Sequence, residues 1–129
     1  MILCLHEILR VGVILFLYQP LAEYMIHRLV HHYKIKYHSQ HHCIWSTNDY
    51  NKYNGDAHVR CFIMVLFGME YYIPALMLLK YETFHTISHT YPNNYLFHHH
   101  RLHHYYPKYN FAVTAIWTDK IFGTFREQI

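Results

Sequence analysis

Histidines grouped at fixed spacings constrain the fold of this chain more than any other feature. They form four clusters: His27-Arg-Leu-Val-His31-His32, His38-Ser-Gln-His41-His42, His85-Thr-Ile-Ser-His89 and His100-Arg-Leu-His103-His104. Residues three or four apart share one face of a helix, so each cluster projects two or three imidazoles in one direction. Together the clusters supply about ten neutral nitrogen donors, enough for two metal ions, and imidazole suits iron, copper, nickel and zinc.

The bulk composition argues for a folded chain rather than a metal-buffering tract. Histidine makes up 15 of 129 residues, but apolar segments separate the clusters, whereas buffering tracts are low in complexity. The length predicts one domain over residues 1–129. Its three cysteines form no C-x-x-C pair, so we expect reduced thiols and neither a disulfide framework nor a zinc knuckle.

Charge and hydropathy favour a membrane protein over a nucleic-acid-binding one. The formal charge is +3, the basic residues lie mostly beside the histidine clusters, and no nucleic-acid recognition motif accompanies them. Positive residues concentrate on the cytoplasmic side of membrane proteins, and the 14 tyrosines suit the headgroup region. Residues 2–26 are mainly apolar and predict one marginal span or an interfacial helix, not a cleaved signal peptide, because Glu7 and Arg10 interrupt the stretch.

A second apolar stretch runs from Cys61 to Leu79, after a polar loop at residues 46–56. A shared metal site needs all four clusters on one side of the bilayer, so the intervening chain must cross an even number of times. About 40 apolar residues would be needed for two full crossings, and only about two dozen are available. We therefore predict a short hairpin that turns near Gly68 to Pro74, with Glu70 solvated at its tip.

The second half of the chain predicts three elements around the site. A helix from Tyr71 should continue to His89 and put His85 and His89 one turn apart, with Pro92 after its end. Residues 95–105 have the helical period for the last histidine cluster. The tail from Asn110 to Thr124 should pack over the site.

Acidic residues are too few for a carboxylate-rich metal site. Ferritin-like sites need two Glu-x-x-His motifs and two further glutamates, but the chain offers only Glu82-Thr-Phe-His85. The absence of His-Glu-x-x-His leaves a zincin protease unsupported. Glu23, Glu82 and Asp119 remain as candidates to orient the imidazoles from outside the ligand set. A nitrogen-rich site within a membrane hairpin suits oxidation of lipid C–H bonds by iron, because zinc has no redox chemistry.

Several stretches resemble the fatty acid hydroxylase and sterol desaturase superfamily of integral membrane di-iron enzymes. They are Glu23-Tyr-Met-Ile-His27-Arg28, the clusters His38–His42 and His100–His104, Tyr81 to His89, and Asn110-Phe111 through Asp119-Lys-Ile-Phe-Gly-Thr124, all in the family's order over roughly residues 20–126. The resemblance implies an all-α protein of membrane hairpins whose histidine-rich cap faces the cytosol, in the endoplasmic reticulum or an equivalent membrane. It also implies use of dioxygen and of electrons from a small haem carrier or a reductase.

Carried over residue by residue, the resemblance implies a ligand set for two iron ions: His27, His32, His38, His41, His42, His85, His89, His100, His103 and His104. His31 competes with His32, because the hydroxylase branch has its second histidine five residues after the first and the sterol desaturase branch four. Glu82 and Asp119 would orient ligands, and His99 would neighbour them. We expect His6, His58 and His98 to be interfacial or surface residues.

The chain also departs from the family pattern. It is short, the loop between the first two clusters is five residues, and Ala112 and Thr118 stand where glycine and tryptophan are usual. The predicted function is an oxygen-dependent lipid hydroxylase. The alternatives are a desaturase with the same metal site and, from another class, a non-catalytic zinc-binding membrane protein.

Overall fold

The computed structural model describes residues 2–43, 68, 70–91, 94 and 97–128. Every regular element in these ranges is helical, and no strand occurs in them, in agreement with the predicted all-α class. In chain order the elements are α1 (Ile2–Val13), the π-helix η1 (Ile14–Tyr18), α2 (Gln19–His32), α3 (Lys36–Cys43), α5 (Tyr72–Thr90), α6 (His98–Tyr105) and α7 (Trp117–Ile121). The polar loop at residues 46–56 and the start of the second apolar stretch lie outside the described residues.

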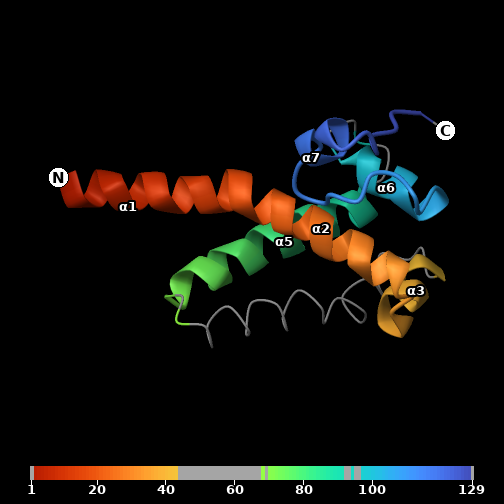
Figure 1. Cartoon of the computed structure of the whole chain (residues 1–129), viewed down its shortest axis with the longest axis horizontal. Coiled ribbons are helices and arrows are strands. Elements are labelled where there is room, and N and C mark those ends of the chain that lie inside the picture. The colour runs from red at the N-terminus through yellow and green to blue at the C-terminus, as the bar shows by residue number, and fades with distance from the viewer. Residues whose placement is uncertain (1, 44–67, 69, 92–93, 95–96, 129) are drawn as a thin grey trace.

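One long helix dominates the shape of the molecule. α1, η1 and α2 follow one another without a break, and α1 extends away from the other elements (Figure 1). The segment Cys4–His32 has 29 residues and a hydropathy of 1.3, with 11% of its apolar window buried. At 1.5 Å per residue it is about 43 Å long, against a hydrocarbon core of about 30 Å. By length and composition it is long and apolar enough to cross a membrane, as the sequence predicted for its apolar part.

The π-helix in the middle of this long helix creates an attachment point for α5. A π-helix pairs each N–H with a carbonyl five residues away, which disturbs the usual α-helical pairing. At this position the Lys80 ammonium donates a hydrogen bond to the carbonyl oxygen of Leu15. One turn along, the Gln19 side-chain amide donates to the carbonyl of Met77 at 2.8 Å. Both contacts fix α5 against the junction of η1 and α2.

A polar cluster ties the start of α5 to α1. Arg10 donates hydrogen bonds to Glu7, to Glu70 and to the hydroxyl of Tyr72, at 2.9 to 3.4 Å. The Glu70 side chain is half exposed, as expected for the tip of the predicted hairpin. Gly68, just before it, has a φ of +83°, a conformation that favours glycine in turns.

Helix α5 confirms the continuous helix predicted through the third cluster. It runs from Tyr72 to Thr90, and Pro74 lies in its first turn, where its missing N–H costs no hydrogen bond. The last cluster lies on α6, which begins at His98, later than the predicted residue 95. The tail covers these helices as predicted, because Phe111, Ala112 and Val113 are buried together with Tyr24 and Leu102.

Candidate metal centre

Histidine side chains from α2, α3, α5 and α6 converge beyond the carboxyl end of the long helix. Two groups could each hold a metal ion, because within each group one ligand nitrogen per residue lies within 4.8 Å of all the others. The first group comprises His27, His31, His38, His42 and His103, and the second His41, His89, His100 and His104. His85 adjoins the second group, with its Nε2 3.1 Å from Nε2 of His41.

The convergence joins parts of the chain that are distant in sequence. Nε2 of His31 on α2 lies 2.9 Å from Nε2 of His103 on α6, 72 positions later. In the second group, His89 of α5 lies 3.2 Å from His100 of α6, measured between Nε2 atoms. The first two clusters and the last two therefore share one site, as the spacing predicted.

Hydrogen bonds between imidazoles do not explain the crowding of ring nitrogens. Nε2 of His38 lies 2.9 Å from Nε2 of both His27 and His31, and 3.0 Å from that of His42. A ring nitrogen carries either one proton to donate or one lone pair to accept with. It can satisfy one such neighbour, not three. Ring nitrogens arranged in this way could instead direct their lone pairs at one shared cation.

The separations match metal coordination. A metal–nitrogen bond of about 2.1 Å places neighbouring donors about 3.0 Å apart in an octahedron and about 3.4 Å apart in a tetrahedron. The contacts of 2.9 to 3.0 Å in the first group fit octahedral edges. Five such donors leave one of six octahedral positions without a protein ligand.

The structure corrects the choice between the two adjacent histidines of α2. We expected His32, five residues after His27, but the ring in the first group is that of His31. At 100° per residue, a spacing of four turns the side chain by only about 40°, whereas a spacing of five turns it by about 140°. His32 is accordingly exposed, and its ring contacts Tyr33 edge-on. The other nine predicted ligands lie in or beside the two groups.

Backbone carbonyls of the tail orient imidazoles from outside the groups. The Nδ1–H of His27 donates to the carbonyl of Phe111, and that of His103 to the carbonyl of Tyr109 at 2.6 Å. His99 contributes its Nε2 to a third contact, 3.2 Å from the carbonyl of Val113. All three carbonyls belong to the tail segment between α6 and α7. With Nδ1 protonated, His27 and His103 present Nε2 lone pairs to the first group.

Two buried carboxylates hold this segment in place. Asp119 of α7 accepts hydrogen bonds from the N–H of Phe111 at 2.8 Å and of Ala112 at 2.9 Å, and also from the Thr124 hydroxyl. Burial raises the pKa of Asp119, and these three hydrogen bonds oppose the shift. Glu23 of α2 accepts from both the N–H and the hydroxyl of Thr114.

The carboxylates therefore act on the ligands through the backbone of the tail. Sequence reasoning named both Glu23 and Asp119 as candidates to orient the imidazoles, but it did not predict that they would do so through backbone carbonyls. The carbonyls themselves carry no sequence signal, because every residue has one. The role predicted for Glu82, half-buried on α5 one turn before His85, stays a prediction.

The environment keeps the imidazoles neutral, as metal binding requires. Burial lowers the pKa of His41 to about 4, and burial together with neighbouring histidines lowers those of His42 and His89 to about 3. The same causes lower the pKa values of His100 and His103. Lone pairs are thus available at neutral pH without release of a proton.

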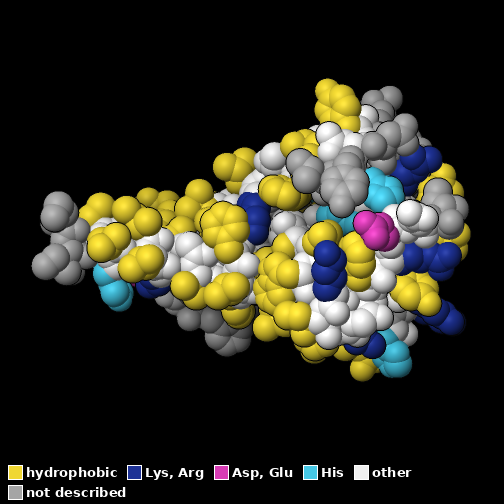
Figure 2. Space-filling model, turned by 90° about the horizontal axis from the view of Figure 1, so that it is seen from above, with side chains coloured by type: hydrophobic (Ala, Val, Ile, Leu, Met, Phe, Trp, Pro, Cys, Tyr) yellow, Lys and Arg dark blue, Asp and Glu magenta, His cyan; other side chains and the backbone are white. Residues whose placement is uncertain are grey.

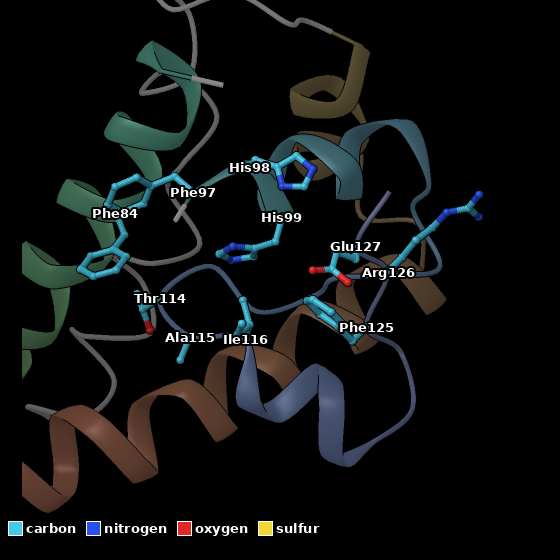
Figure 3. A pocket seen from close by; sticks show the side chains of 10 residues that line it. All are labelled: Phe84, Phe97, His98, His99, Thr114, Ala115, Ile116, Phe125, Arg126 and Glu127. Atoms are coloured by element: carbon cyan, nitrogen blue, oxygen red, sulfur yellow. The ribbon is translucent and has the colours of Figure 1, made fainter. Parts of the chain in front are cut away.

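The remaining described histidines belong to neither of the two groups. His6 is exposed on α1, and His58 lies outside the described residues. His98 and His99 line a cavity of about 330 Å³ that opens beside the start of α6 (Figure 3). Phe84, Phe97, Ile116 and Phe125 give this cavity a largely apolar wall. His99 and Phe84 of this lining are next in sequence to His100 and His85, but no histidine of the two groups lines the cavity itself.

Comparison with known proteins gives no relative for this chain. No protein-family model, no curated protein and no solved structure matches it. The histidine clusters could bind metal ions, and this capacity rests on the geometry of the site itself.

Proposed function

We propose that this chain is a membrane-bound oxygenase that holds two iron ions in its histidine groups and hydroxylates a C–H bond of a lipid. The observation that supports this proposal most directly is that three ring nitrogens lie 2.9 to 3.0 Å from Nε2 of His38. A shared cation would explain this convergence, whereas hydrogen bonding does not. Neutral imidazoles suit several metals, but zinc has no redox chemistry, so iron fits an oxidation.

The apolar arm supports a membrane location. Hydrophobic side chains cover the narrow part of the molecule that ends at the N-terminus, while most of the visible Lys and Arg side chains lie on the wide part (Figure 2). On the arm, Leu9, Phe16 and Leu17 are 57% to 65% exposed, which would be unfavourable in water. Arg10 lies 17 residues before His27, or about 25 Å along the helix, close to the thickness of a hydrocarbon core. Embedding this stretch would put the histidine groups at one surface of the membrane, and the proposal assigns them to the cytosolic surface.

The apolar cavity beside His99 supports a lipid substrate. Its aromatic wall of Phe84, Phe97 and Phe125 offers contacts to a hydrocarbon chain and few hydrogen bonds to a polar molecule (Figure 3). Arg126 and Glu127 at the same cavity could contact a polar headgroup. A bilayer delivers such a substrate directly to a site at its surface.

The residues of the chain have defined tasks in this proposal. When bound, the two iron ions supply activation of dioxygen for insertion of one oxygen atom into the C–H bond, while the other leaves as water with two electrons and two protons from a donor. The tail carbonyls hold His27 and His103 with Nε2 toward the first group. Burial of His100 and His103 excludes water from the centre.

The electron donor is proposed from the family resemblance and from charge. A small haem protein or a reductase would dock on the cytosolic surface, and the proposed membrane is that of the endoplasmic reticulum or an equivalent. Exposed Lys34, Lys36 and Lys108 near the first group offer positive charge to an acidic partner. Nothing in the site favours nucleic acid.

Anaerobic purification followed by metal analysis tests the metal content. About two irons per chain is expected, and zinc alone with no iron-dependent turnover would favour the non-catalytic zinc-binding alternative. Lipid analysis of cells that express the wild type or His103→Ala identifies the product. A hydroxylated lipid present only with the wild type supports the proposal, a new double bond supports the desaturase, and identical lipids in both would refute either enzyme.

A further inference from the structure

A second cavity, separate from the apolar one beside His99, opens onto the first histidine group. It has a volume of about 200 Å³ and is lined by three ligand histidines, His31, His38 and His42, together with Val30, Lys34, Ser39 and Pro107. No carboxylate is among these lining residues. Lys34, Ser39 and Pro107 are exposed, so the cavity connects the group to the surface of the cap.

The turn between α2 and α3 puts a lysine at this opening. Lys34 has a φ of +49°, and the N–H groups of Lys34 and Ile35 donate to the carbonyls of His31 and Val30. This is the backbone pattern that ends helices with a residue in the left-handed region, for which glycine is usual. A lysine here adopts a backbone conformation that is strained for a residue with a side chain, and Lys34 lines the cavity together with His31 and His38.

The positive charge of a metal centre that holds two cations would favour binding of an anion. Two divalent cations held by neutral imidazoles carry four positive charges, and such charges are costly to bury without a counter-charge. Asp119 and Glu23 already accept hydrogen bonds from the tail segment. The first group also has five ligands, which leaves one octahedral position without a protein donor.

From these observations we propose that the cavity over His31, His38 and His42 is an entry and binding site for a small inorganic anion, which ligates the metal of the first group while the Lys34 ammonium contacts it. The inference rests on the proposed metal centre. It adds that the two metal positions differ, because the anion binds at the first group. The second group is the more enclosed of the two: His41, His89 and His100 are buried, whereas His31, His38 and His42, which line the cavity, are half-buried.

Azide binding to the cobalt-loaded protein tests this site without any measurement of turnover. The visible absorption of Co²⁺ reports ligand exchange, so azide should change the spectrum of the wild type in a saturable way. Lys34→Glu leaves every histidine in place and should raise the Kd for azide about tenfold, through reversal of a nearby charge. Lys120→Glu, the same change at an exposed lysine of α7, should leave the Kd unchanged.

Single-group variants locate the bound anion. His100→Ala should keep cobalt in the first group and keep the azide response, whereas His103→Ala should keep cobalt in the second group and lose it. Equal Kd values for the wild type and Lys34→Glu, or an azide response confined to the second group, would overturn the inference alone. A wild-type protein that binds no cobalt would overturn the metal centre and the inference together.

Discussion

The carboxylate of Asp119 accepts a hydrogen bond of 2.8 Å from the N–H of Phe111, and the carbonyl of Phe111 accepts one from the ring of His27. A buried acid thereby fixes a ligand that it does not touch. Asp119 is fully buried, so its loss leaves backbone donors without a partner in the interior. The covering segment orients the histidines of the candidate metal centre, in addition to the helices that carry them.

Asp119→Asn should weaken metal binding at the first group more than at the second. An amide offers one acceptor oxygen in place of the two that bind Phe111 and Ala112, so the segment that orients His27 loosens. Changes to groups that orient ligands typically cost 10–100-fold in metal affinity. Competition with a chelator measures the two affinities separately.

Thr124→Val is the matched control for this change. It removes one hydrogen bond to the same carboxylate but leaves both backbone contacts of Asp119 in place. We expect a smaller loss of affinity. If Asp119→Asn and the wild type bound metal with equal affinity at both groups, the hydrogen bonds from Asp119 to the tail backbone would not be needed to orient His27.

Alanine substitutions at adjacent positions of α2 separate the two candidate ligands. His31→Ala should lower metal affinity at the first group, because Nε2 of His31 lies 2.9 Å from Nε2 of both His38 and His103. His32→Ala should bind metal like the wild type, since its exposed ring faces away. Metal content after dialysis measures both. Loss of metal in His32→Ala with retention in His31→Ala would contradict the structure.

The metal-free protein should lose stability in mild acid. An unfolded histidine has a pKa of about 6.5, whereas in the folded chain the pKa is about 4 for His41 and about 3 for His42 and His89. Between pH 6.5 and 4 the unfolded chain therefore binds more protons, and the free energy of unfolding falls as pH falls, by at most about 1.4 kcal/mol per pH unit and histidine. Denaturant titrations with a chelator at pH 7.5, 6 and 5 measure this, and equal midpoints would contradict it.

A charge in the middle of the long helix should impair membrane insertion. Leu17 is 57% exposed and lies near the centre of Cys4–His32, so Leu17→Arg should cost about 2.5–3.5 kcal/mol in a bilayer. Leu29→Arg, the same change near the cap, should be tolerated because its charge reaches the headgroups. Alkaline extraction of membranes measures integration. Complete retention of Leu17→Arg in the membrane fraction would argue against a spanning helix.

Periodicity was sufficient to predict the helices and the convergence of the clusters. His85 and His89 share one face of α5, because this feature depends on the regular repeat of an α-helix. The apolar run from Val11 to Tyr18 also lies within the long helix, but nothing in the sequence predicted the π-helix over Ile14–Tyr18. The choice of His32 came instead from spacing within a known family. The repeat of the helix favours His31, which shows that local geometry was the better guide at this position.

The sequence by itself determined two features of the site. Its spaced histidines predict a site dominated by neutral nitrogen donors, and its N-terminal apolar residues predict an apolar segment beside that site. Only the tertiary structure decided how the donors divide into two groups and which backbone carbonyls orient them. The contact of Phe111 with His27 joins residues 84 positions apart. Every residue offers a carbonyl, so sequence carries no mark of the one that is used. Packing of the tail by Asp119 and Glu23 makes that selection.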